Sequence, residues 1–198
     1  MKSNNQQSEP KLDRPGAGVP LMLRLVMRYY LGPFKAGKAD WRESREQGDR
    51  IHAKILQAVE GLTEAQLSKK VLVPPQPGLE DSSRYWSIAM ALEHLLITHP
   101  LMSHAIVELT NGRLPDGKAD TAAVKPLGTM APKDAVAQFR GLAARIFVEL
   151  ETKIGDRHSP LTFDHPWFGP FKARQWYWLI GQHAGLHYQQ IKKIKAGL

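Results

Sequence analysis

The chain has 198 residues, and its 27 Lys and Arg against 19 Asp and Glu give a formal net charge of +8. A content of 42% hydrophobic and 23% charged residues excludes wholesale disorder, and the lack of cysteine excludes disulfides, Cys-ligated zinc and a thiol nucleophile of the protein's own. The positive charge would suit anionic substrates, nucleic acid or membranes, but the basic residues are scattered and we find no motif for nucleic-acid recognition.

The N-terminal part divides into two segments. Residues 1–18 are polar with Pro and Gly, so we expect a mobile tail. Residues 19–34 are apolar but interrupted by Arg24 and Arg28, which predicts a short helix that cannot span a bilayer. Such a helix can lie on a membrane surface. We expect it instead to pack on its own domain or on a second subunit, and we expect a cytoplasmic protein because no convincing secretory cleavage site follows.

The main domain is predicted from residue 40 to 198. Asp40 suits the N-cap of a helix over about 41–66, in which His52 is expected to be partly exposed. The next stretch, residues 71–84, contains three prolines and a glycine. It predicts an irregular connection, which can line a pocket.

A second long helix is predicted over residues 88–111, with Ser87 as its N-cap and a kink at Pro100. His94 lies on its inward face, together with Thr98 as a pocket candidate. By contrast, His99 and His104 point elsewhere on the helix. We expect them to be solvated or to support a ligand from behind.

A third helix is predicted from Pro132 to about residue 154, after a long loop over 112–130. The connection that follows it, residues 156–171, is rich in aromatic residues, Pro and His. Because a proline follows His165, the backbone there is restricted. We expect His165 and Trp167 to line the mouth of a pocket.

The last helix, over residues 172–195, contains His183 and His187 four positions apart on its apolar side. Two imidazoles one turn apart can bind one divalent cation. A protease reading of this pair lacks its general base, because no Glu lies between them. The alternative is a pair of ordinary helical histidines, one packed and one exposed.

Four long amphipathic helices without a convincing alternating strand predict an all-α bundle with an additional short N-terminal helix. Residues 40–195 resemble the DinB/YfiT-like superfamily of bacterial four-helix bundles, many of which are thought to be metalloenzymes. The resemblance rests on two runs: Trp86-Ser87 through His94-Leu95, and His183 through Ile191.

The resemblance implies a metal site formed by His94, His183 and His187, with an open coordination position for water or substrate. It implies a divalent metal, zinc first and nickel or iron as alternatives. Gln190, one turn beyond His187, either hydrogen-bonds a ligating imidazole or is a surface amide. The resemblance further implies a small-molecule substrate and either a thiol-dependent S-transferase, using a low-molecular-weight thiol, or a hydrolase.

Two other classes of function stay open from the sequence. The bundle could be non-catalytic, binding a small ligand or acting as a dimeric stress-associated protein, in which case His165 would close the metal site as a fourth ligand. The net charge of +8 could instead serve a membrane or nucleic-acid partner, a reading ranked last. We expect a homodimer, as is common among bundles of this type.

Overall fold

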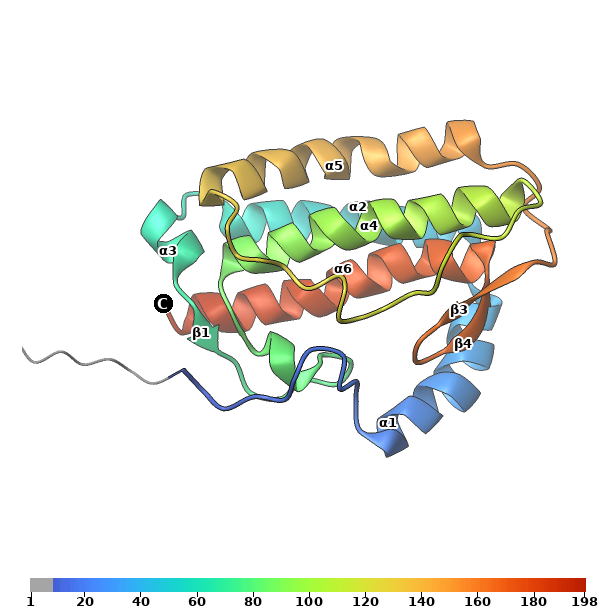
Figure 1. Ribbon diagram of the computed structural model, residues 1–198. Helices are drawn as coiled ribbons and strands as arrows, with labels where there is room; N and C mark the ends of the chain where they lie inside the picture. Colours follow the sequence, from blue (N-terminus) through green and yellow to red (C-terminus); the bar gives the residue numbers. More distant parts are fainter. Residues whose placement is uncertain (1–8) are drawn as a thin grey trace, which may run out of the picture.

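Four long helices form the body of the molecule in the computed structural model, which describes residues 9–198 (Figure 1). They are α2 (Trp41–Val59), α4 (Ile88–Thr110), α5 (Pro132–Lys153) and α6 (Ala173–Ala196). Helices α2 and α4 each pack against both α5 and α6. The prediction of an all-α four-helix bundle is therefore confirmed. None of the helices in the described residues combines the length and apolar character that crossing a membrane requires.

The N-termini of these helices are set by local chemistry. Asp40 accepts a hydrogen bond from the Glu43 amide at 3.0 Å, and Ser87 accepts one from the Met90 amide at 3.2 Å. Each satisfies a donor that the first helical turn leaves free. Helix α5 begins at Pro132, whose missing N–H costs nothing at that position.

Helix α2 ends at Val59, earlier than residue 66. The chain leaves the helix at Gly61, which has a φ of +73°, and Thr63 then caps the separate short helix α3 (Glu64–Ser68). A residue with positive φ is most often glycine, so the turn is explained locally. Helix α4, by contrast, is continuous from Ile88 to Thr110, with Pro100 inside it.

The N-terminal segment forms α1 (Leu21–Val26), which continues into the π-helix η1 (Met27–Lys35) and the short 3-10 helix η2 (Ala36–Lys38). Figure 1 shows α1 outside the four-helix body, on the side of the hairpin formed by β3 (Thr162–His165) and β4 (Gly169–Lys172). Of the expected mobile tail, residues 1–8 lie outside the described residues. The part that is described follows the surface: the Asp13 amide donates to the Asp81 carboxylate at 2.9 Å.

The described residues include two small hairpins, in stretches that have no clear strand pattern in sequence. Strand β1 (Val71–Leu72) pairs antiparallel with β2 (Tyr85–Trp86), and β3 (Thr162–His165) pairs antiparallel with β4 (Gly169–Lys172). The 3-10 turn η3 (Asp81–Ser83) lies between β1 and β2. In the second hairpin His165 is opposite Gly169, whose φ of +79° closes the turn. The aromatic connection is therefore an ordered hairpin.

Helices α2 and α6 approach closely at two glycines. A Cβ at Gly181 would lie 3.2 Å from the Gly48 Cα, and a Cβ at Gly48 would lie 2.3 Å from the Phe147 ring. Hydrogen side chains at both positions let the backbones meet. One turn beyond Gly48, His52 is only 2% exposed, with its ring between Phe139 and Phe147. The prediction of a partly exposed His52 was wrong, because the close helix approach places it in the core.

Candidate metal centre

Three histidines from two helices converge in the middle of the bundle. His94 comes from α4, and His183 and His187 come from successive turns of α6. The Nε2 atom of His183 lies 3.2 Å from Nε2 of His94 and 3.3 Å from Nε2 of His187. The structure thus brings together the three residues that the sequence suggested as ligands, with their potential ligand atoms within 4.8 Å of one another.

Hydrogen bonds behind two of the rings determine which nitrogen faces the centre. The Nδ1 atom of His94 lies 2.7 Å from the Val124 carbonyl oxygen, which can only accept, so Nδ1 carries the proton. The Nδ1 atom of His187 lies 2.7 Å from Oε1 of Gln190, whose own Nε2 donates to the Ser83 carbonyl at 2.7 Å. Both rings therefore direct an unprotonated Nε2 at the centre.

Burial keeps these imidazoles neutral. It lowers the pKa of His94 to about 4, with a smaller contribution from the charge of Lys125. Burial likewise holds the pKa of His183 and that of His187 well below the ordinary value, and the neighbouring imidazoles lower them further. A neutral imidazole is the form that binds a metal ion.

The donor set fits a divalent cation. Two nitrogens on a tetrahedral zinc are about 3.3 Å apart, since Zn–N bonds are about 2.0–2.1 Å, and the observed separations match this spacing. The unprotonated Nε2 atoms of His94 and His187 both face Nε2 of His183. Without a cation, a single proton on His183 could form a hydrogen bond with only one of them, whereas a cation can bind all three. Three neutral nitrogens suit zinc, nickel or iron and leave a coordination position open.

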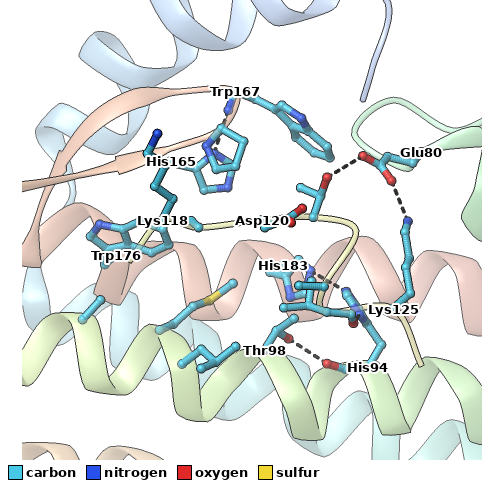
Figure 2. A pocket seen from close by; sticks show the side chains of 18 of the residues that line it. Glu80, His94, Thr98, Lys118, Asp120, Lys125, His165, Trp167, Trp176 and His183 are labelled. Carbon is cyan, nitrogen blue, oxygen red and sulfur yellow. Dashed lines mark hydrogen bonds and ion pairs between the residues drawn. The ribbon is translucent and has the colours of Figure 1, made fainter. Parts of the chain in front are cut away.

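A cavity of about 270 Å³ opens above the three histidines (Figure 2). Helix α4 contributes Thr98 and Met102 to its wall, and α6 contributes Trp176. The β3–β4 hairpin contributes His165 and Trp167, which Figure 2 shows across the cavity from His183. The three pocket residues suggested by the sequence, Thr98, His165 and Trp167, thus share one cavity with the histidine cluster.

A buried ion pair between Glu80 and Lys125 holds the loop over residues 112–130, which forms another wall of the cavity. Glu80 is 3% exposed, and its carboxylate lies 2.6 Å from Nζ of Lys125 and 2.9 Å from the Thr121 hydroxyl. Burial alone would raise the pKa of Glu80, but the hydrogen bond and charge of Lys125 bring it below its usual value. Burial lowers the pKa of Lys125, while its hydrogen bond to Glu80 acts in the opposite direction. The contact between the two groups fixes this end of the loop.

Glu93 holds the same loop from the other side. Its two carboxylate oxygens accept hydrogen bonds from the Leu127 amide at 3.1 Å and the Gly128 amide at 3.0 Å. Glu93 is adjacent to His94 in sequence and therefore points about 100° away from it on the helix, so it is not a ligand. The structure gives it a positioning role, since it fixes the loop segment that includes Val124.

His165 stands at the rim of the cavity and is not one of the clustered ligands. Its Nδ1 accepts hydrogen bonds from the Trp167 amide at 3.1 Å and the Phe168 amide at 3.3 Å, so Nε2 carries the proton. Burial among aromatic side chains lowers the pKa of His165 to about 3. The ring is a neutral hydrogen-bond donor at physiological pH.

His99 differs from the expectation of a solvated side chain. It is fully buried, its ring centroid lies 6.0 Å from that of His183, and His52 lies 5.3 Å beyond it. Among the described residues, neither ring nitrogen of His52 or His99 has a hydrogen-bond partner. The solvated alternative was wrong because α4 is enclosed by α5 and α6 together, so more than one of its faces is buried. His104 is exposed, although it borders the cavity.

Several site residues were missed from the sequence. Glu80, Ser83, Val124 and Lys125 all lie in irregular connections, where no helical period indicates which side chain points inward. The only usable signal was the proline-rich composition of residues 71–84, which suggested a pocket wall. Its partners in the loop over 112–130 gave no signal at all.

Comparison with known proteins places this geometry in a family. The model of the DinB superfamily matches residues 49–191. No curated protein matches the chain. Two solved structures share the fold. The first, TT2238, a four-helix bundle protein, has 19% identity and a TM-score of 0.53 over 77% of this chain and 98% of its own.

The second is YfiT from Bacillus subtilis, described as "a probable metal-dependent hydrolase with an unusual four-helix bundle topology". It has 21% identity and a TM-score of 0.55, over 79% of this chain and 86% of its own. At these identities the two structures establish the fold alone. The family model matches well over half of the chain, and the chain therefore belongs to the DinB superfamily.

Proposed function

We propose that this protein is a metal-dependent hydrolase that acts on a small molecule. The observation that carries the proposal is the convergence of three neutral, Nε2-directed imidazoles from His94, His183 and His187 at the floor of a cavity. A divalent ion held there by three ligands would lower the pKa of a bound water towards 7. The description of YfiT as a metal-dependent protein supports the same reading.

The residues around the cavity have separate roles in this proposal. Val124 and Gln190 keep the ligand nitrogens of His94 and His187 unprotonated and aimed at the ion. His165 offers its Nε2–H to a polar oxygen of the substrate, at the rim opposite the ligands. Asp120 is the carboxylate that we assign as proton acceptor, because Glu80 is occupied by Lys125.

The size of the cavity favours hydrolysis over transfer. A volume of about 270 Å³ is at the lower end for ligand pockets, which favours one small substrate and a water molecule over two organic reactants. The walls include Trp176, Trp167 and Met102, so the substrate has an apolar part. A thiol-dependent S-transferase is the alternative, and its thiol would come from a cosubstrate because the chain has no cysteine.

Metal content tests the site directly. Tag-free protein analysed by elemental mass spectrometry should contain one zinc, nickel or iron per chain, and His94→Ala, His183→Ala and His187→Ala should each lose it. His158→Ala is the matched control, because that histidine is exposed and remote in sequence from the cluster. Retained stoichiometry in all three ligand variants would refute the proposal.

Turnover separates the reaction classes. Metal-loaded protein should hydrolyse members of a panel of small esters and amides without added thiol. Activity that appears only with a low-molecular-weight thiol would favour the transferase. Bound metal without turnover in either format would favour the non-catalytic bundle.

A further inference from the structure

The N-terminal helix exposes an apolar face that the bundle does not cover. Seven of the twelve large exposed apolar side chains in the described residues lie within 21–34, between 40% and 72% exposed. They are Leu21, Met22, Leu25, Val26, Tyr29, Tyr30 and Phe34. Isolated exposed apolar residues need no explanation, but a contiguous group of this size marks an interaction surface.

The N-terminal helix has two apolar sides, and only one of them packs against the bundle. Leu23, Met27 and Leu31, spaced by four residues, pack against the core of the bundle. The wider turn of the π-helix η1 keeps residues four apart nearly in line, so the exposed residues form a stripe on the other side. We define this stripe as the N-terminal apolar face. Packing on its own domain, which the sequence led us to expect, therefore involves only one of the two apolar sides of this helix.

The charged residues of the N-terminal segment, over residues 14–39, are all basic. The sequence has no acidic residue between Asp13 and Asp40. The same interval contains five cations, namely Arg14, Arg24, Arg28, Lys35 and Lys38. All five are exposed. A partner for this face must accept apolar side chains and carry negative charge along its edge.

The helix contacts the β3–β4 hairpin closely at two glycines. A Cβ at Gly32 would lie 3.8 Å from the Phe168 ring, and one at Gly169 would lie 3.3 Å from the Arg28 guanidinium carbon. The helix therefore rests on the hairpin that carries Trp167 of the cavity rim. Figure 1 shows α1 on the outside of the molecule beside this hairpin.

We propose that the N-terminal apolar face docks on the surface of an anionic lipid membrane. Its aliphatic side chains would enter the boundary between headgroups and acyl chains, and Tyr29 and Tyr30 suit the interfacial region. The five cations would contact lipid phosphates. A second copy of the chain fits less well, because a two-fold contact through this face would bring like charges together.

Vesicle co-sedimentation of the full chain tests the proposal. The protein should bind phosphatidylcholine vesicles that contain about 30 mol% phosphatidylserine, bind pure phosphatidylcholine vesicles far less, and dissociate as salt is raised. Replacing Tyr29, Tyr30 and Phe34 together by Ser should abolish binding. Removing charge with Lys35→Gln and Lys38→Gln should weaken it about fivefold per residue.

Leu114→Ser combined with Leu127→Ser is the matched control, since it removes exposed apolar side chains elsewhere and should leave binding unchanged. All the replaced side chains are exposed, so thermal unfolding should not change. The proposal is overturned if the protein does not bind anionic vesicles, or if it binds both vesicle types equally. It is also overturned if sedimentation velocity shows a dimer that the Tyr29, Tyr30 and Phe34 replacement dissociates, while vesicles bind no protein.

Discussion

His187 and Gln190 are joined by a 2.7 Å contact between ring Nδ1 and amide Oε1, on one buried turn of α6. The orientation of the amide is not free, because its Nε2 donates to the Ser83 carbonyl at 2.7 Å. Gln190 therefore accepts a hydrogen bond from the Nδ1–H of His187 and leaves the opposite ring nitrogen available to a cation. A side chain outside the ligand set thus determines the protonation pattern of a ligand.

Replacing Gln190 by Leu should weaken metal binding by about 10–100-fold, as losses of such supporting hydrogen bonds do. The measurement is competition against a chromophoric chelator of known affinity. Gln189→Leu is the control, because the Gln189 side chain is exposed on the same helix. Equal affinities for the two variants would show that Gln190 does not position His187.

His165→Asn, which keeps a short acceptor but removes the Nε2–H donor, should keep full metal stoichiometry but lose turnover by about 100-fold, as when a hydrogen bond to a developing charge is removed. Metal retention follows because His165 is outside the cluster of three histidines. Elemental analysis and steady-state kinetics on one preparation measure both quantities. Loss of the metal would identify His165 as a fourth ligand and favour a closed, non-catalytic site.

The metal-free protein should lose stability as the pH falls below neutrality, partly through His52. Burial lowers the pKa of His52 from 6.5 to about 4, so the unfolded chain takes up a proton first. The stabilisation is complete above pH 6.5 and is lost as the pH falls towards 4 and below, to a total of about 3 kcal/mol.

Urea unfolding at pH 7 and pH 4.5 measures this effect. His52→Leu should show a smaller loss of unfolding free energy between the two pH values than the parent protein. His99 lies 5.3 Å from His52 and its pKa is lowered partly by the charge of His52, so the difference reports His52 together with its effect on His99. Identical pH dependence in the two proteins would contradict the assignment.

Two glycine-to-alanine substitutions should change the free energy of unfolding in opposite directions. Gly48→Ala should destabilise the fold by about 1–3 kcal/mol, because its Cβ would meet the Phe147 ring at 2.3 Å. Gly185→Ala should stabilise it by about 0.5–1 kcal/mol, since no atom lies within 4 Å of its Cβ position in α6. Chemical denaturation of both variants checks the pair, and a stabilised Gly48→Ala would refute the close approach of Phe147 on α5 to Gly48 on α2.

The parts of the site on periodic elements were predictable from the sequence. His183 and His187 share a stripe with apolar residues, and that stripe can only face inward in a bundle. His94 followed from the same argument on α4. The rule fails for His52 and His99, because it assumes one buried face per helix, whereas close packing at Gly48 and enclosure of α4 bury a second face.

The loop partners could not be predicted for a different reason. Glu80 and Lys125 are 45 positions apart in irregular segments, and their 2.6 Å contact depends on how both segments fold over the bundle. The β3–β4 hairpin was missed because its four-residue strands are too short for alternation to stand out. Local patterns determine helices well, but they carry little information on where a connection returns.

The adjacent residues Glu93 and His94 hold one short loop segment at two places, through Leu127 and Gly128 on one side and Val124 on the other. An insertion between these points would move the Val124 carbonyl away from the His94 ring and disturb the ligand. Residues 114–118 carry no such hydrogen bond, although several border the cavity. The N-terminal end of this loop can therefore change in evolution and alter what the cavity binds, while the C-terminal end keeps the His94 ring in place.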